Sequence, residues 1–185
     1  MNGPVTTLRP ALPADVPRLE ALIVRSGIEL SAGFYTPAQA AAITEHVFGV
    51  DSQLIADGTY FIIERDGVPV ACGGWSKRGT LFGGDRAKRG ADPLLDPAQE
   101  PARIRAFFVA PEAARQGLGR QLLRHCSTEA AAAGFKALEL AATLPGVPLY
   151  AAHGFEVGEQ FELALPGGVS VSLARMRKWI GPGAG

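Results

Sequence analysis

The chain has 185 residues, 47% of them apolar, which is enough to bury one hydrophobic core without disulfides or metals. Lys plus Arg and Asp plus Glu number 18 each, so no overall charge favours nucleic acid or an anionic membrane as a partner. We therefore expect a single domain over residues 1–185 whose partner is a small molecule or a peptide, and the formation of a homodimer is left open.

The cysteines, the histidines and the start of the chain exclude several other classes. Cys72 and Cys126 are far apart and lack C-x-x-C spacing, so we expect reduced core thiols. His46, His125 and His153 are too scattered for a metal site, and no metal is predicted. The first residues lack the charged head and apolar run of a signal peptide, and no apolar run reaches about 18 residues, the length of a membrane helix. These features predict a cytoplasmic protein.

The amino-terminal segment predicts one strand followed by two helices. Residues 5–9 are typical of a short strand, and apolar residues at helical spacing follow from Asp15. Thr36 precedes Pro37, which is the order of a capping residue and a proline in the first helical turn. A second helix is therefore expected over residues 38–48.

A hairpin and a long irregular segment come next. Two runs rich in β-branched and aromatic residues, 59–65 and 68–75, are separated by Asp66-Gly67, the strongest short signal for a hairpin. Residues 76–102 then lose all periodicity and are rich in Gly, Pro and charged residues. In a compact domain a segment of this length is functional or disordered. We refer to residues 76–102 as the flap.

The remaining residues predict an alternation of strands and helices. Residues 104–109 include Ala106-Phe107-Phe108-Val109, a run that is apolar on both faces, as in a strand buried in the middle of a sheet. Residues 117–133 carry one apolar face and end before Gly134, a left-handed cap. The further elements expected are a strand over 136–141, a short helix over 145–153, and a hairpin with strands over 155–165 and 169–179. This order predicts an α/β fold (α+β in some schemes), with a mixed sheet of about seven strands flanked by about four helices.

The turn before the long helix has the features of an anion site. Arg115-Gln116-Gly117-Leu118-Gly119-Arg120 follows a buried strand and opens a helix, so several backbone N–H groups lack intrahelical partners. Gly117 and Gly119 carry no Cβ atom that would hold a ligand away from the backbone. The helix dipole, together with Arg115 and Arg120, favours a diphosphate. Taken alone, a G-x-G sequence fits a tight turn without a ligand equally well.

Two other phosphate-binding motifs fit this turn poorly. No Gly-Lys-Ser/Thr follows it, which excludes a P-loop. In a dinucleotide-binding fingerprint the third glycine would be Leu122, and too little chain remains for a doubly wound sheet, although Glu139 lies at about the distance of a ribose-binding acid.

The sequence resembles the GNAT superfamily of acyl-CoA-dependent N-acetyltransferases over almost its whole length. The motifs are Thr7-Leu8-Arg9-Pro10-Ala11 with Asp15, Phe108-Val109-Ala110-Pro111-Glu112 leading into the glycine turn and on to Leu123, and Leu149-Tyr150-Ala151-Ala152-His153-Gly154-Phe155. The resemblance implies coenzyme A in a V-shaped gap where the fourth and fifth strands splay apart, its pyrophosphate on the glycine turn and its pantetheine arm along the fourth strand. Carried over by position, the cofactor-binding residues are Phe107, Phe108 and Val109 on the strand edge, Arg115, Gln116, Gly117, Leu118, Gly119 and Arg120 in the turn, and Thr143.

Two positions depart from the family pattern. Ala114 stands where many members carry Arg or Gln three residues before the first glycine, and we expect Arg115 to supply the charge instead. Thr143 stands where many members carry an asparagine that touches the pantetheine arm, and its hydroxyl can still donate one hydrogen bond.

The resemblance also implies the reaction, which is direct transfer of acetyl from acetyl-CoA to an amine of a small molecule or peptide. A backbone N–H of the Phe108-Val109 edge would stabilise the oxyanion. Tyr150 would give a proton to the departing thiolate, because a phenol with a pKa of about 10 is protonated at neutral pH. The general base is not assigned, and the candidates are ordered water, Glu64, Glu139 and Asp85.

Two alternatives to an enzyme remain open at this stage. One is a module of the same fold that binds or senses acyl-CoA without turnover, and the other is a structural partner protein with an empty glycine turn. If the chain is an enzyme, we expect the flap to form one wall of the acceptor site, because the family's acceptors approach from that side. The alternative is a solvated loop without a role in the site.

Overall fold

The computed structural model describes residues 5–182. Residues 1–4, part of the start in which the sequence indicates no signal peptide, and residues 183–185 lie outside it. Short 3₁₀ turns occur in several connections between the helices and strands. The main elements are β1 (Thr6–Pro10), α1 (Val16–Glu29), α2 (Pro37–His46), α3 (Ser52–Ala56), β2 (Tyr60–Arg65), β3 (Val68–Ser76), β4 (Ala102–Val109), α4 (Leu118–Ala132), β5 (Ala137–Thr143), α5 (Val147–Ala151), β6 (Glu156–Leu165) and β7 (Val169–Trp179).

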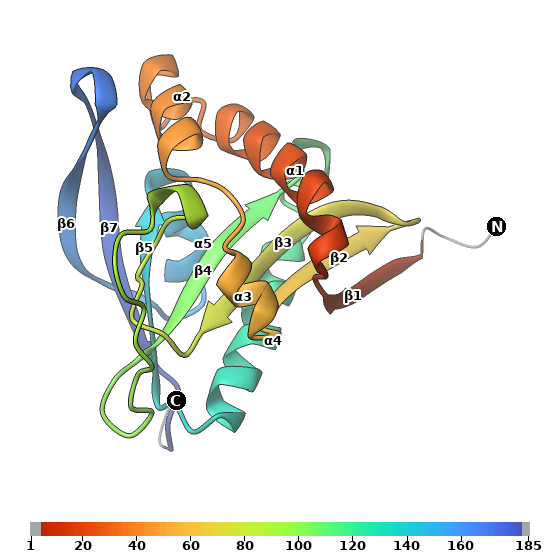
Figure 1. Cartoon of the computed structure of the whole chain (residues 1–185), viewed down its shortest axis with the longest axis vertical. Helices are drawn as coiled ribbons and strands as arrows, with labels where there is room; N and C mark the ends of the chain where they lie inside the picture. Colours follow the sequence, from red (N-terminus) through yellow and green to blue (C-terminus); the bar gives the residue numbers. More distant parts are fainter. Residues whose placement is uncertain (1–4, 183–185) are drawn as a thin grey trace.

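The strands form one seven-stranded mixed sheet, as predicted. Their order is β1-β2-β3-β4-β5-β7-β6, and every neighbouring pair is antiparallel except β4 and β5, which are parallel. Both α1 and α4 pack on β3 and β4. The two helices cover opposite faces of the sheet, since Figure 1 shows α1 in front of the strands and α4 behind them.

The parallel pair splays apart along most of its length. Pairing between β4 and β5 is limited to Ala102 with Leu138 and Arg103 with Glu139, although the strands have eight and seven residues. Past these pairs the β4 edge that faces β5 has no strand beside it in the described part of the chain. This confirms the predicted splay between the fourth and fifth strands, and we call the space that it opens the gap.

Short sequence motifs correctly predicted several turns and helix ends. Asp66 and Gly67 have φ of 50° and 77°, the left-handed values that a two-residue hairpin turn of this type requires. Thr36 Oγ1 accepts a hydrogen bond from Gln39 N–H, and Gln39 Oε1 accepts one from Thr36 N–H, so the expected cap of α2 is a full capping box. Gly134 follows α4 with φ of 93°, as expected of a left-handed cap.

Other elements differ from the expectation. The helix α3 was not predicted, because five residues are too few to show a helical period. Strand β4 begins at Ala102, two residues earlier than expected, because its first residues pair with β5. The short helix expected over residues 145–153 is α-helical only over Val147–Ala151 and is preceded by a 3₁₀ turn, Leu144–Gly146.

Two apolar clusters hold the elements together. The larger lies on both faces of the sheet and includes the fully buried Leu19 of α1 and Leu122 of α4. The smaller joins α2 to β7 through Ile43 and Val171. Cys72 and Cys126 are buried free thiols, as predicted, and burial raises the pKa of Cys72 to about 12. In residues 5–182 none of the helices combines the length and apolarity needed to cross a membrane.

Candidate active site

The start of α4 presents unpaired backbone amides. Gly117 is the residue before the helix, with a left-handed φ of 81°, and no side chain of the described residues caps this end. Arg115 is also left-handed, with a φ of 63°. Left-handed residues in such a turn aim successive N–H groups toward one point, which makes an anion-binding concavity. The first-turn amides of α4 are therefore oriented for an anion.

An open hollow of about 370 Å³ lies at this helix start. Its lining residues are Gly117, Arg120, Gln121 and Arg124, so two guanidinium groups and no carboxylate surround it. Arg124 was not selected from the sequence, although it lies one turn after Arg120 and therefore on the same helix face. The residues present suit a diphosphate group.

The two glycines of the turn have different surroundings. A Cβ on Gly117 would meet nothing within 4 Å, so this residue serves the left-handed turn and the open hollow. A Cβ on Gly119 would lie 3.0 Å from Leu149 Cδ2, so this residue allows α4 to pack closely on α5. The helix start and the helix that carries Tyr150 are therefore in direct contact.

The carboxyl-terminal half of β4 forms one edge of the gap. Phe108 pairs with Cys72 and Val109 with Ala71 on the opposite edge, and Ala110 N–H donates to Val70 O at 2.8 Å. Because N–H groups alternate between the two edges of a regular strand, Phe108 N–H faces β3 and Val109 N–H faces the gap. The Ala106 carbonyl points toward Tyr60 of β2, so Phe107 N–H, on the opposite side of the same trans peptide plane, points away from β2 toward the gap.

One of the amides on the gap edge already has a partner. Val109 N–H donates to the Ser26 hydroxyl of α1 at 3.3 Å, a long hydrogen bond. Ser26 is buried, and nothing in its local sequence marks it as a neighbour of β4, so sequence analysis missed it. Of the three edge residues predicted from the sequence, Phe107 is the one whose N–H faces the gap beside the aromatic residues of the site.

Tyr150 lies on α5 next to this edge. Its ring centroid is 6.2 Å from that of Phe107 and 5.7 Å from that of Phe155. Burial raises the pKa of the Tyr150 hydroxyl, and the nearby Cys126 thiol raises it further. A Cβ on Gly146 would lie 3.2 Å from the Tyr150 ring and 3.5 Å from Thr143 Oγ1, so one small residue separates the two. The structure thus brings Phe107, Tyr150 and Thr143 to the same region.

The three carboxylates considered as general bases already have partners. Glu64 accepts hydrogen bonds from Arg9 and Arg18, and the bond from Arg9 holds the pKa of Glu64 below its usual value. Glu139 is paired with Arg103 and Arg175, and Asp85 accepts from Ser52 N–H. The general base stays unassigned. In residues 5–182 no group of three or more His, Cys, Asp or Glu side chains lies close enough to hold a metal ion.

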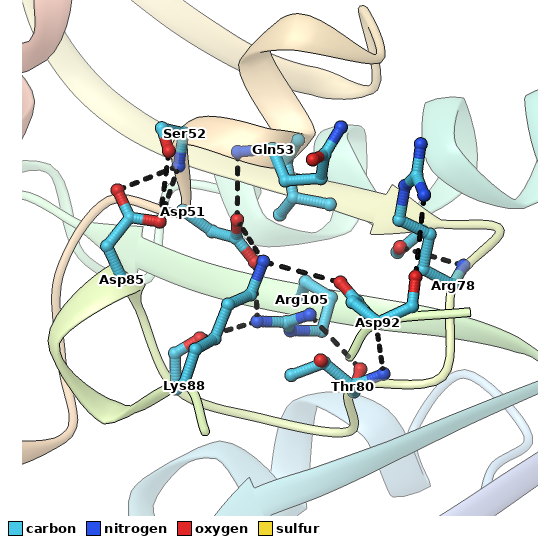
Figure 2. A network of polar contacts seen from close by, with 12 residues as sticks. Asp51, Ser52, Gln53, Arg78, Thr80, Asp85, Lys88, Asp92 and Arg105 are labelled. Carbon is cyan, nitrogen blue, oxygen red and sulfur yellow. Dashed lines mark hydrogen bonds and ion pairs between the residues drawn. The ribbon is translucent and has the colours of Figure 1, made fainter. Parts of the chain in front are cut away.

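A buried ion pair anchors the flap to β4. Asp51, which is fully buried, pairs with Arg105 at 2.9 Å and with Lys88 of the flap at 2.6 Å. Arg105 also donates to the flap carbonyl of Thr80, and Lys88 lies 3.3 Å from Asp92 (Figure 2). The flap is therefore ordered, rather than disordered, over the residues that these contacts connect. A sequence signal existed, since Arg105 is a charged residue in an apolar strand.

The fold is that of an acetyltransferase, as a comparison with known protein families shows. The model of the acetyltransferase (GNAT) family matches residues 30–155, more than half of the chain. The chain belongs to the GNAT family of acetyltransferases. No curated protein matches its sequence.

Several solved structures share the fold. A GCN5-related N-acetyltransferase from Rhodopseudomonas palustris has a TM-score of 0.70 and 21% identity, over 97% of this chain and 98% of that one. The PaiA N-acetyltransferase from Thermoplasma acidophilum, solved in complex with coenzyme A, has a TM-score of 0.65 and 12% identity, over 95% and 99%. The ribosomal-protein-S18-alanine N-acetyltransferase from Escherichia coli has a TM-score of 0.58 and 18% identity, over 96% and 95%. At these identities the likeness concerns the fold alone.

Proposed function

We propose that this protein transfers the acetyl group of acetyl-CoA directly to an amine of a small molecule or peptide. The observation that carries the proposal is the uncapped start of α4, lined by Arg120 and Arg124, beside the gap between β4 and β5. An anion site next to an unpaired strand edge suits a ligand with a diphosphate at one end and amide groups along its arm. A structural neighbour was solved in complex with coenzyme A, which is consistent with a ligand of this kind.

Different residues of the chain would bind the diphosphate and the pantetheine arm of acetyl-CoA. Backbone amides of residues 115–120 and the side chains of Arg120 and Arg124 would hold the diphosphate. The gap edge of β4 past Phe107 would pair with the pantetheine arm through the Val109 carbonyl, because Val109 N–H already donates to Ser26, and Thr143 would donate one hydrogen bond to the arm. Acetyl-CoA supplies an acetyl group activated as a thioester.

The chemistry requires little from side chains. The amine nitrogen forms a bond to the acetyl carbon as the carbon–sulfur bond breaks, and the surplus amine proton passes to ordered water. A backbone N–H on the gap edge would stabilise the charge on the acetyl oxygen. Tyr150 would give its proton to sulfur and recover one from water. Because burial raises the pKa of Tyr150, its hydroxyl is protonated at neutral pH, which is the form that this role requires.

The flap would form one wall of the acceptor site. It is tied to β4 by Arg105, and its Phe82 ring lies 6.1 Å from that of Phe161 on β6. These contacts hold the flap near the outer strands, on the side from which an amine would approach. The cytoplasmic location inferred from the sequence stays a prediction.

Two measurements test the proposal. Calorimetry with acetyl-CoA reports binding, and a screen of amines and peptides with acetyl-CoA, scored by thiol release, reports transfer. Binding together with amine-dependent thiol release is the expected result. Binding without release for any amine would favour a non-catalytic acyl-CoA module, and absence of binding would exclude both readings.

A further inference from the structure

Strand β4 contains a bulge where it runs along the gap. Ala106 has a left-handed φ of 53°, which is unfavourable for a residue with a side chain. The register with β3 shifts between Cys72, opposite Phe108, and Gly74, opposite Arg105. Two residues of β4, Ala106 and Phe107, therefore oppose one residue of β3, which is the definition of a bulge. Such strain persists only where the surroundings hold it.

A buried hydroxyl holds this bulge from the side of β2. Tyr60 is 0% exposed, and its hydroxyl donates to the Ala106 carbonyl at 2.9 Å. Burial raises the pKa of Tyr60 well above its usual value, so the hydroxyl keeps the proton that it donates. The residue before the bulge, Arg105, is held independently by Asp51 and by the flap (Figure 2).

A glycine of β3 leaves room for the side chain that the bulge presents. A Cβ on Gly73 would lie 2.4 Å from the Phe107 ring, so the ring occupies space that any other residue would fill. The Phe107 ring in turn packs against Tyr150. The backbone at Ala106 therefore fixes two features at once, the Phe107 ring and the Phe107 N–H on the gap edge.

The neighbouring amides leave Phe107 N–H as the donor for the reacting group. Phe108 N–H faces β3, and Val109 N–H donates to Ser26. We propose that Tyr60 is a positioning residue for acetyl transfer, because its hydroxyl holds the Ala106 carbonyl and thereby aims Phe107 N–H at the acetyl oxygen of bound acetyl-CoA. This inference rests on the proposed function.

Loss of the Tyr60 hydroxyl should affect binding of the acetyl group but not binding of the rest of the ligand. Past the bulge, β4 is held by its pairs with Ala71 and Cys72, which do not involve Tyr60. Tyr60→Phe keeps the ring but removes the hydrogen bond to Ala106. The hydrogen bond to the acetyl oxygen weakens, whereas the pairing that would hold the pantetheine arm stays.

The test compares the dissociation constants of acetyl-CoA and of coenzyme A, measured by calorimetry. In Tyr60→Phe the dissociation constant of acetyl-CoA, divided by that of coenzyme A, should rise about three- to tenfold over the parent. This is the effect of weakening one hydrogen bond, and the affinity for coenzyme A itself should stay nearly unchanged. Tyr35→Phe is the matched control. Its hydroxyl donates to Ser172 O and accepts from Leu144 N–H, away from the bulge, so this variant should keep the parental ratio.

A second variant separates positioning from general stability. Ala106→Gly in the Tyr60→Phe protein relieves the left-handed strain and should recover part of the lost stability. Since glycine leaves the bulge freer, the ratio should stay high. Recovery of the parental ratio together with stability would overturn the inference, as would an unchanged ratio in Tyr60→Phe or an equal change in Tyr35→Phe. A parent that binds neither ligand would overturn the proposed function as well.

Discussion

Tyr150 combines a protonated hydroxyl with contact to the strand edge where the acetyl group is proposed to lie. Tyr150→Phe keeps the ring packed against Phe107 and Phe155 but removes the proton. We expect the rate of thiol release at saturating acetyl-CoA and acceptor to fall by about 10²-fold or more, the usual contribution of a positioned general acid. Coenzyme A affinity and the melting temperature should change little.

The pH dependence gives a second check on Tyr150. Burial raises its pKa, so the parent should lose no proton donation up to the ordinary tyrosine pKa of about 10. Equal rates for the parent and Tyr150→Phe would mean that solvent protonates the thiolate, and Tyr150 would then be a packing residue beneath the cofactor.

Asp15 is the centre of an ion cluster that joins β1, α1 and β2. Its buried carboxylate accepts from Arg9 at 2.8 Å and from Arg18 at 2.5 Å, and both arginines also reach Glu64. The hydrogen bond from Arg9 is the main reason why the pKa of Asp15 is well below its usual value. A lowered carboxyl pKa stabilises the fold fully above the unfolded-state value of about 4. This contribution declines as pH falls below that value and is lost as pH passes through the lower folded-state pKa.

We therefore expect Asp15→Asn to lower the free energy of unfolding by about 1–2 kcal/mol at pH 7, since both arginines are partly exposed. Below pH 4 the difference between parent and variant should shrink, because the parent loses its advantage there. Urea unfolding at pH 7 and pH 3 measures both values. A difference that stays constant between the two would show that packing, not charge, is the cause.

Some of these residues could be predicted from the sequence and others could not. Tyr150 and the glycine turn stand in continuous motifs, so their positions were predictable. Tyr60 and Asp51 act on partners 46 and 54 positions away, Ala106 and Arg105, and no local pattern joins such pairs. Ser26 could not be predicted either, because its partner Val109 lies 83 positions away in the sequence.

At the scale of elements, the flap depends on charges that it shares with the core. Lys88 contributes one cation to two carboxylates, Asp51 and Asp92. Lys88→Met leaves Asp51 paired with Arg105, so the fold should survive while the flap loosens. Hydrogen exchange in residues 80–92 should rise about five- to tenfold, the effect of losing the ion pairs of Lys88 with Asp51 and Asp92.

The same variant tests the role of the flap in acceptor binding. With an amine identified by the screen, its Michaelis constant should rise in Lys88→Met and coenzyme A affinity should stay nearly the same. Lys88→Arg keeps the charge and serves as the control. Faster exchange in α4 by the same factor would indicate general destabilisation, and a loss of coenzyme A binding alone would contradict the assignment of the flap to the acceptor.

Elements with local signals were predicted well, and those without them were not. The Asp66-Gly67 hairpin, the capping box of α2 and the glycine after α4 each follow from two or three adjacent residues. The order of the flap has no such signal, because its residues are irregular and their partners lie on β4 and before α3. Length and composition alone left open whether the flap is ordered.

On the scale of the whole molecule, the gap divides the sheet into two parts. Strands β1–β4 and β5–β7 are joined by two paired positions between β4 and β5, and the glycine turn lies where β4 leads into α4. A ligand that lies along β4 and reaches Thr143 on β5 would connect both parts. Its binding free energy then adds to the stability of the folded chain as a whole.

Acetyl-CoA should therefore raise the free energy of unfolding by about 2.7 kcal/mol at a concentration one hundred times its dissociation constant. Gly119→Val should abolish this effect, because even a Cβ at this position comes within 3.0 Å of Leu149 and a larger side chain would push α5 and Tyr150 away from the helix start. Gly158→Val is the control, since position 158 on β6 is open and its nearest neighbour, Arg175 O, is 3.8 Å away. Thermal unfolding with and without acetyl-CoA measures the effect, and circular dichroism reports whether each variant folds. If the folded Gly119→Val protein is stabilised as much as the parent, the ligand does not bind at the start of α4, and the site proposed here is wrong.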